Sequence, residues 1–333
     1  METVIYKATQ ENIKKCAEII KNGGLVAFPT ETVYGLGANA LLGKSVKEIY
    51  AAKGRPSDNP LIVHVADKST VFEIAKTVPP LALKFMDAFM PGPVTAVLPK
   101  KSIVPDVVTG GLNTVAVRMP QNEIARTLIS LAGVPVCAPS ANTSGKPSPT
   151  CAKHVYFDLN GKIPAILDGG DCAVGVESTV IDFTLSSPRL LRAGGMPLET
   201  IEKVIGPVEV VRNSKVALCP GMKYKHYSPE AEVYMALPEG NAVERMSAAF
   251  DKAESENKKT VIIAMSSLKG SFGARTVWDA GNDCACYAHN LFAFLRKADD
   301  EKYSVVICQG VEEKGMGASV YNRLIKAAGG KTI

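Results

Sequence analysis

Two cations and a hydroxyl lie close together in the segment KGRPSDNPLIVHV. Lys53 and Arg55 end a predicted helix, and Ser57 follows in a polar loop before a predicted strand. Cations at this position could simply complement the C-terminus of the helix. They could equally bind phosphate oxygens, and an arginine can do so through two hydrogen bonds at once. The residues alone leave both interpretations open.

A second candidate site is the segment APSANTSGKPSPT, which is dense in hydroxyls and turn residues. A loop of this kind can present backbone N–H groups and hydroxyls to phosphate oxygens, although an ordinary surface loop is the alternative. Its position directly after a predicted strand and its low content of Glu and Lys favour binding. Ser140 is a poor candidate for a nucleophile, because no GxSxG motif surrounds it.

Two arginines interrupt otherwise apolar strands, Arg118 in TVAVRMP and Arg192 in LLRAGG. A cation in such a run needs an anionic partner or a place at the exposed end of the sheet. A structural salt bridge explains each arginine about as well as a ligand does. Ser178 and Thr179 enter another predicted strand. Together these side chains suit a ligand that carries a triphosphate and a carboxylate.

The segment PTETVYGLGANA imitates a dinucleotide-binding fingerprint through Gly35 and Gly37. The fingerprint requires its glycines directly after a strand, with an acidic residue about twenty positions later. Here several residues intervene, so we expect a strand end that carries Thr30 and Thr32 into a tight glycine turn. A lone histidine in a strand, such as His64 in LIVHVA, is more often structural.

Motifs of covalent and metal-dependent catalysis are missing from the sequence. We find no GxxxxGK[ST] loop, no HExxH motif and no obvious Ser/His/Asp triad. The eight cysteines include no CxxC pair and no zinc spacing, which indicates free, partly buried thiols. Chemistry by positioning and charge neutralisation therefore fits better than a protein nucleophile.

Length and composition describe a globular chain of two domains. The 333 residues exceed one ordinary core, and 46% of them are hydrophobic. No run approaches the roughly 20 apolar residues that span a bilayer, and the N-terminus lacks an apolar signal region, so we expect a cytoplasmic protein. The net charge of +5 is mild for a dedicated nucleic-acid binder.

Alternating strand and helix patterns predict an α/β fold. Predicted strands cover 25–30, 61–66, 94–100, 114–120, 134–140, 178–183, 188–193, 231–237, 260–266 and 303–309. Predicted helices cover 11–22, 45–54, 122–133, 197–206, 241–257, 284–300 and 319–328. The order predicts a twisted, open, mixed sheet in residues 1–211 and a smaller doubly wound domain in residues 230–333.

Residues 212–229 predict a linker between these domains, with a Pro-Gly turn and a Ser-Pro stop. Arg212, Lys215, Lys223 and Lys225 occur here without an acidic residue. The segment is either a solvated spacer or a stretch that meets an anionic ligand. Its aromatic content, which includes Tyr227, is unusual for a spacer.

Taken in order, seven segments resemble the YrdC/TsaC-type threonylcarbamoyl-AMP synthases. They are PTETVYGLG, KGRPSDNPLIVHV, PGPVTAVL, TVAVRMP, PSANTSGKPSPT, GVESTVID and LLRAGG. The linker CPGMKYKHYSP and the ending GMGASVYNRLIKAAGG resemble the long form of the family, which has a second, C-terminal domain. The family's KxR and SxN signature corresponds to Lys53, Arg55, Ser140 and Asn142.

The resemblance implies a twisted open sheet with a concave basic face. It implies an enzyme that joins L-threonine, bicarbonate or CO2, and ATP into threonylcarbamoyl-AMP and pyrophosphate. A downstream transferase complex would then modify an adenosine of tRNA next to the anticodon, giving N6-threonylcarbamoyladenosine. Mg²⁺ would be held mainly by the ATP phosphates, because the sequence offers no evident cluster of carboxylate ligands.

The family's site residues carry over position by position. The KxR and SxN residues would perform the catalysis. The resemblance assigns L-threonine to Thr30, His64, Arg118, Ala138 and Ser178. It assigns ATP to Lys53, Arg55, Ser57, Thr114, Ser140, Asn142, Ser148, Arg192 and Tyr227.

Three further hypotheses follow from the sequence. Tyr227 and its basic neighbours would form a lid over the nucleotide. A non-catalytic RNA-binding module with the same basic face is one alternative function, although low aromatic content speaks against base stacking. A carbamoyl transferase of the same fold is another, but the cysteine pairs of such proteins are absent.

Overall fold

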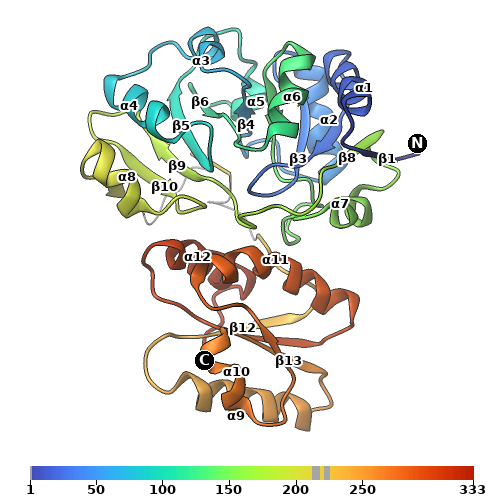
Figure 1. Ribbon diagram of the computed structural model, residues 1–333, viewed down its shortest axis with the longest axis vertical. Coiled ribbons are helices and arrows are strands. Elements are labelled where there is room, and N and C mark those ends of the chain that lie inside the picture. The colour runs from blue at the N-terminus through green and yellow to red at the C-terminus, as the bar shows by residue number, and fades with distance from the viewer. Residues whose placement is uncertain (1, 212–217, 221–225) are drawn as a thin grey trace. The chain divides into compact units, whose positions relative to one another are not determined.

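The chain folds into two compact units. The computed structural model describes residues 2–211, 218–220 and 226–333 (Figure 1). The first unit contains the described residues of Met1–Ser144, Pro149–Ala173 and Glu177–Tyr224, and the second those of Gly145–Ser148, Val174–Val176 and Lys225–Ile333. Arg212, Lys215, Lys223 and Lys225, the basic residues of the expected linker, lie outside the described residues.

The first unit combines eight α-helices and eleven strands among its described residues. The helices are α1 (Gln10–Lys21), α2 (Gly43–Lys53), α3 (Ser69–Ile74), α4 (Pro80–Phe89), α5 (Asp106–Thr109), α6 (Glu123–Ala132), α7 (Ala152–Leu159) and α8 (Leu198–Ile205). The strands are β1 (Val4–Lys7), β2 (Val26–Phe28), β3 (Gly35–Asn39), β4 (Ile62–His64), β5 (Val94–Pro99), β6 (Thr114–Arg118), β7 (Val136–Ala138), β8 (Ala165–Asp168), β9 (Thr179–Asp182), β10 (Arg189–Arg192) and β11 (Glu209–Val210).

These strands form one mixed sheet in the order β1-β8-β2-β3-β7-β4-β6-β5-β9-β10-β11. The sheet contains parallel pairs such as β4 with β6 and antiparallel pairs such as β5 with β6. The expected open, mixed sheet is therefore confirmed.

Helices pack on both faces of this sheet, and more of them lie on one face than on the other. On one face α1 and α6 pack against a cluster that includes Phe28, Val136 and Leu167. Residues of α2, α3, α4, α5, α7 and α8 belong to the larger core on the other face. Local signals fix the helix ends: the Asn122 side chain accepts a hydrogen bond from Ala125 N, and Gly133 ends α6 with a φ of 66°.

The second unit is a smaller α/β layer structure, as expected from the sequence. Its four parallel strands are ordered β12-β15-β13-β14. They are β12 (Glu232–Ala236), β13 (Thr260–Ala264), β14 (Val277–Asp279) and β15 (Val305–Gln309), and the helices are α9 (Ala242–Ser255), α10 (Ser266–Lys269), α11 (Cys284–Asp300) and α12 (Met316–Ala327), with a 3₁₀ turn at Gly270–Phe272.

One local expectation is wrong. Gly35 and Gly37 do not form a tight turn but lie in strand β3, which pairs antiparallel with β2. Both glycines serve close packing: a Cβ on Gly37 would lie 2.7 Å from Phe28 Cε1 and 2.9 Å from Val136 Cγ1. At Gly37 the strand approaches its neighbours so closely that a side chain on this residue would clash.

The expectation of thiols without disulfides is confirmed, since none of the eight cysteines forms a disulfide and five of them are buried. Within the described ranges, no helix has both the length and the apolar character that a bilayer crossing requires.

Candidate functional site

The sheet register places polar residues side by side on one face of four neighbouring strands. His64 on β4 pairs with Arg118 on β6, as Ile62 pairs with Ala116. Because alternate residues of a strand share a face, these four side chains point to the same side. On the strands that follow, Thr95 of β5 and the residues leading into β9 extend this row.

An apolar cluster marks this face. It consists of Ile62, Val97, Ala116, Val180, Leu191 and Cys219, with Val211 and Leu218 packed against it. All these residues belong to strands or to the segment 211–219, so among the described residues no helix contributes to the cluster. Among the described residues, this part of the face is therefore covered by residues of the segment 211–219 instead of a helix, and the six residues of the cluster are buried.

A buried ion pair occupies one end of the face. Arg118 Nη2 lies 2.8 Å from Glu31 Oε1, and the two side chains are only 5% and 8% exposed. The strand arginine thus has the anionic partner that its apolar surroundings require.

Hydrogen bonding in this pair is incomplete. Four buried atoms of the pair have no hydrogen-bond partner of acceptable geometry. They are both carboxylate oxygens of Glu31 and the Nε and Nη2 atoms of Arg118. Buried charges without such bonds are costly, which makes the pair a candidate for binding a ligand with complementary charges. Glu31 is absent from the residues predicted from the sequence. The sequence feature that could have identified it is an acidic residue between two threonines at the end of a strand.

Thr30 is buried beside this pair and organises the turn that carries Glu31. Its Oγ1 donates to Val33 O at 2.7 Å and accepts from the backbone N–H groups of Thr32 and Val33. The hydroxyls of Thr30 and Thr32 lie 2.8 Å apart. These bonds fix the backbone on both sides of Glu31.

His64 is a neutral partner next to the arginine. Burial and the neighbouring Arg118 charge lower the pKa of His64 from 6.5 to about 3. Its Nδ1 lies 3.1 Å from Ile62 O, and its ring meets Phe28 edge-on at a centroid distance of 6.0 Å. At neutral pH this histidine adds no charge to the face.

The low pKa of His64 predicts a stability that falls with acidification. Below pH 6.5 the unfolded chain binds a proton at His64 that the folded chain does not, so the free energy of unfolding decreases. By pH 5 the loss amounts to about 2 kcal/mol. Urea unfolding of His64→Gln should therefore lose less stability between pH 8 and pH 5 than the wild type does. A histidine NMR titration that places the His64 midpoint above pH 6 would contradict this.

Lys53 holds the SxN loop. Its buried Nζ donates to Ser140 O at 2.6 Å and to Asn142 O, and lies 3.5 Å from Asn142 Oδ1. Ser140 Oγ in turn donates to Asn142 Oδ1 at 2.5 Å. The helix α2 ends at Lys53, because Gly54 takes a φ of 60°, and this sends the side chain towards the loop.

The other residues of the KxR segment are more exposed. Arg55 is half-buried and its Nη2 donates to Pro60 O at 3.2 Å, whereas Ser57 is exposed. Thr114 is half-buried where β6 begins, opposite Pro99 of β5. These side chains are accessible to a ligand.

A third cluster joins Ser178 and Arg192. Arg192 Nη2 donates to Ser178 O at 2.9 Å and to Ser178 Oγ at 3.1 Å. Ser178 Oγ also lies 2.8 Å from Thr95 Oγ1. Nε of Arg192 also donates to Ser178 O at 3.1 Å, and Nη1 donates to Pro220 O at 3.1 Å, which joins the described linker residues to the face.

The structure brings most of the predicted residues into these clusters. Ala138, the last residue of β7 before the SxN loop, pairs with Ile62 of the neighbouring strand β4. Two predicted residues, Ser148 and Tyr227, belong to the second unit. No group of His, Cys, Asp and Glu side chains within the described ranges could hold a metal ion.

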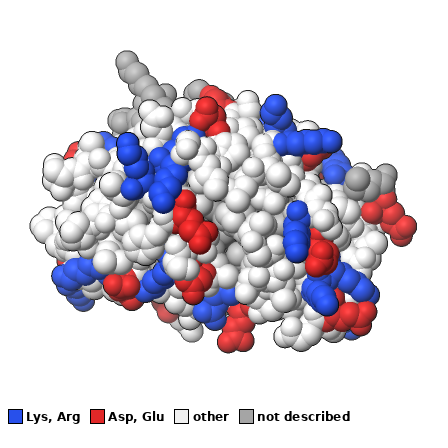
Figure 2. Space-filling model, turned by 90° about the horizontal axis from the view of Figure 1, so that it is seen from above, with Lys and Arg blue, Asp and Glu red and all other residues white. Residues whose placement is uncertain are grey.

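Charge on the surface is mixed. Figure 2 shows one face on which basic and acidic side chains are interspersed with a large uncharged area. The residues visible in that view form no continuous basic stripe of the kind that nucleic-acid binding requires.

Two sequence families match successive parts of this chain. Residues 18–194 match the sequence family of Sua5, YciO and YrdC, described as telomere recombination. Residues 196–329 match the family described as threonylcarbamoyl-AMP synthase, C-terminal domain.

Individual relatives extend over nearly the whole chain. Threonylcarbamoyl-AMP synthase of Pyrococcus abyssi is 50% identical over 327 residues, which are 96% of this chain and 95% of that protein. The Bacillus subtilis synthase is 43% identical over 328 residues, with coverages of 96% and 94%. A solved structure of P. abyssi Sua5 complexed with L-threonine is 48% identical, with a TM-score of 0.93 and coverages of 100% and 98%.

Proposed function

This chain belongs to the threonylcarbamoyl-AMP synthases of the two-domain Sua5 type, and we propose that it makes threonylcarbamoyl-AMP on the face of its larger sheet that carries Arg118 and His64. The observation that carries the proposal is the buried Arg118–Glu31 pair with its incomplete hydrogen bonds. A free amino acid carries the same two charges and can complete both sets of bonds.

In this proposal threonine replaces the direct contact between Arg118 and Glu31 with one contact to each of them. Its carboxylate takes the place of Glu31 beside Arg118, and its ammonium group binds the Glu31 carboxylate. The neutral His64 supports this exchange, because a second cation there would compete with the ammonium group. Thr30, the Ala138 backbone and Ser178 line the same substrate.

ATP binds through the remaining clusters. Arg55, Ser57 and Thr114 are the accessible groups, and Arg192 is the arginine beside Ser178. Lys53 acts differently from a simple phosphate ligand, because two of its three donors already bind loop carbonyls. It positions Ser140 and Asn142 and places a positive charge beneath the loop that receives the phosphates.

The reaction needs no protein nucleophile. The threonine ammonium group first loses a proton, and the amine nitrogen then bonds to the carbon of CO2 and releases a second proton, which gives an N-carboxylate. With bicarbonate, the bond from carbon to the hydroxyl oxygen breaks instead and water leaves. A carboxylate oxygen then attacks the α-phosphorus of ATP, the bond to the β-phosphate oxygen breaks, and pyrophosphate leaves. Negative charge accumulates around the phosphorus, and the arginines and Lys53 stabilise it electrostatically.

Mg²⁺ is proposed to enter with ATP. The Glu31 carboxylate beside the site is engaged by Arg118. Phosphate oxygens and water would therefore supply the ligands of the ion. When bound, the ion would neutralise charge on the leaving pyrophosphate.

We further propose a cytoplasmic enzyme whose product passes to a threonylcarbamoyl transferase complex acting on tRNA. We retain the domain boundaries 1–211 and 230–333, with residues 212–229 as an active-site lid. Two contacts support the lid: Cys219 is fully buried in the apolar cluster of the face, and Pro220 O accepts from Arg192. A covered face would exclude water from the labile mixed anhydride.

Pyrophosphate release tests the proposed function. Purified protein with ATP and Mg²⁺ should release pyrophosphate only when L-threonine and bicarbonate are both present, since each supplies an atom of the attacking group. Release that continues without threonine would show a different ATP-consuming reaction and would refute the proposal.

The lid predicts a specific role for the ring of Tyr227. This residue is buried and has a φ of 65°. Its ring packs against the ring of Phe292 with a centroid distance of 5.1 Å, and the Arg323 guanidinium lies over the ring. Tyr227→Ala removes the ring that holds this backbone, so nucleotide affinity should fall by about tenfold and product release should accelerate. Tyr227→Phe keeps the ring and should change release less. Unchanged affinity and release in Tyr227→Ala would refute the lid.

A further inference from the structure

A crevice of about 640 Å³ lies in the second unit, outside the residues assigned to the synthase reaction. It sits where the parallel strands β12, β13 and β15 end, and residues following each of these strands line it. Its volume is within the range of pockets that hold small ligands.

The topology makes this position a natural binding site. After β12 the chain continues into α9 on one face of the sheet, and after β15 it continues into α12 on the opposite face (Figure 1). The two neighbouring strands therefore send their connections in opposite directions and leave a gap between them. Ligands of open α/β sheets bind at such switch points, at the carboxyl ends of the strands.

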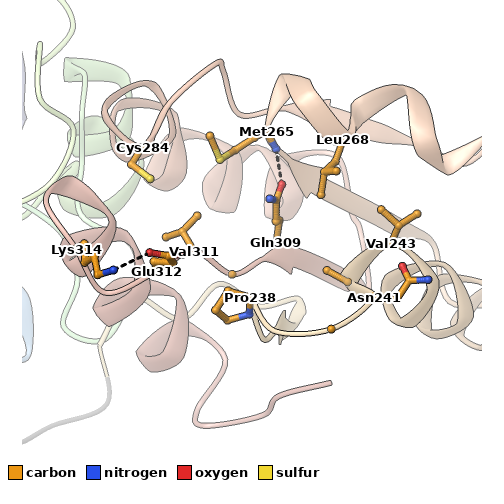
Figure 3. A pocket seen from close by; sticks show the side chains of 13 residues that line it. Pro238, Asn241, Val243, Met265, Leu268, Cys284, Gln309, Val311, Glu312 and Lys314 are labelled. Atoms are coloured by element: carbon orange, nitrogen blue, oxygen red, sulfur yellow. Dashed lines mark hydrogen bonds and ion pairs between the residues drawn. The ribbon is translucent and has the colours of Figure 1, made fainter.

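The crevice has two chemically different ends. Figure 3 shows Val311, Glu312 and Lys314 at one end, and Val243 with Leu268 at the other. Pro238, Met265 and Gln309 lie between them. A ligand that fills the crevice must therefore be long enough to meet both environments.

One end offers hydrogen-bond donors. The backbone N–H groups of Val311 and Glu312 donate to no acceptor among the described residues. The helix α12 begins just beyond them at Met316, and its N-cap residue, Gly315, provides no side-chain cap. Lys314 adds a cation. Its Nζ lies 3.4 Å from Glu312 Oε2, and both side chains are highly exposed. Backbone donors and a lysine next to a helix N-terminus suit a phosphate group.

The other end carries the aliphatic side chains of Val243 and Leu268 together with the polar Asn241, and the middle of the crevice carries the amide of Gln309. Gln309 Oε1 accepts a hydrogen bond from Met265 N at 2.9 Å, which leaves the two amide hydrogens of Gln309 for a ligand. The aliphatic side chains of Val243 and Leu268 can cover a flat ring. A heteroaromatic base combines such a ring with acceptors on its edge.

We propose that this crevice binds a nucleoside monophosphate. Its phosphate lies at the loop from Val311 to Gly315, and its base lies between Val243 and Leu268 with an edge towards Gln309. The exposed Glu312 turns into solvent when the phosphate arrives, because its contact with Lys314 is weak. This second site belongs to the second unit alone and is independent of the proposed synthase site.

Methyl NMR of the full-length protein tests this site directly. Met265 lines the crevice, and the signal lost in Met265→Leu identifies its methyl group in protein labelled with [¹³C-methyl]methionine. AMP should shift this signal saturably, and adenosine and inorganic phosphate should each bind more weakly than AMP. Methionines of the first unit report any binding there separately.

Charge reversal provides the matched test. Lys314→Glu should weaken AMP binding at the Met265 signal by about tenfold and leave adenosine binding unchanged, because only AMP carries the phosphate. Lys252→Glu, at an exposed lysine of α9 that does not line the crevice, should leave both unchanged. No saturable AMP shift of Met265, or a shift with equal affinity in Lys314→Glu, would overturn the proposal.

Discussion

Replacing Arg118 with Gln should lower kcat/KM for L-threonine by at least roughly 100-fold, because it removes the cation that holds the substrate carboxylate. The same change leaves Glu31 as an unpaired buried charge. We expect this to reduce the free energy of unfolding by about 3–5 kcal/mol. Steady-state kinetics with threonine as the varied substrate, and urea unfolding, measure the two effects separately.

Substitutions of Glu31 separate the effect of Arg118 on threonine binding from its effect on the free energy of unfolding. In Glu31→Gln/Arg118→Gln both charges are gone, so stability should recover relative to Arg118→Gln while threonine turnover stays low. Glu31→Gln alone should weaken threonine relative to 3-hydroxybutyrate, an analogue without the amino group that competes for the same site. Equal loss of affinity for both compounds would show that Glu31 does not bind the ammonium group.

Arg189 offers a matched control for these variants. It is also a strand arginine paired with a buried carboxylate, since its Nη2 lies 2.6 Å from Asp182 Oδ2. It occupies the opposite end of β10 from Arg192. Arg189→Gln should therefore cost stability without a specific effect on threonine. A comparable fall in kcat/KM for threonine in Arg189→Gln would attribute the Arg118 result to general destabilisation.

Replacing Lys53 with Ala should abolish measurable synthesis, with an expected loss of about 100- to 1,000-fold, typical of a removed preorganised donor. Without the ammonium group the carbonyls of Ser140 and Asn142 lose a shared donor, and the SxN loop loses the charge beneath it. The two effects act on the same loop. Affinity for ATP and the rate of pyrophosphate release measure the consequence.

Lys47 lies on the same helix but is exposed, so Lys47→Ala controls for removing a lysine from α2. It should leave synthesis unchanged. Circular dichroism of Lys53→Ala must show a folded protein, since the buried carbonyls that lose their donor cost about 1–3 kcal/mol each. Folded Lys53→Ala with normal turnover would remove Lys53 from the mechanism.

The periodic elements were predictable because their patterns are long and their ends carry clear signals. The helix predicted at 284–300 coincides with α11 (Cys284–Asp300), and Asp283 caps it by accepting a hydrogen bond from Cys286 N. The strands around Arg118 and His64 were also predicted, since Val and Ile dominate them. Short or edge elements such as β1 and β14 lacked a strong pattern and were missed.

The contacts of the site depend on tertiary packing, which sequence patterns do not contain. The pairing of Arg118 with Glu31 joins residues 87 positions apart, and nothing local to either residue predicts it. The strand at Gly35 and Gly37 looked like a turn, because the reason for these glycines is the nearby ring of Phe28. The role of Lys53 as an anchor likewise became visible only through its carbonyl partners.

The most direct test of the account follows labelled carbon from bicarbonate into the product. Purified protein is incubated with ATP, Mg²⁺ and [¹⁴C]bicarbonate, with and without L-threonine, and the nucleotides are separated immediately. The account predicts labelled threonylcarbamoyl-AMP that forms only with threonine and is absent with folded Lys53→Ala. Folded wild-type protein that yields no labelled nucleotide under these conditions would contradict it.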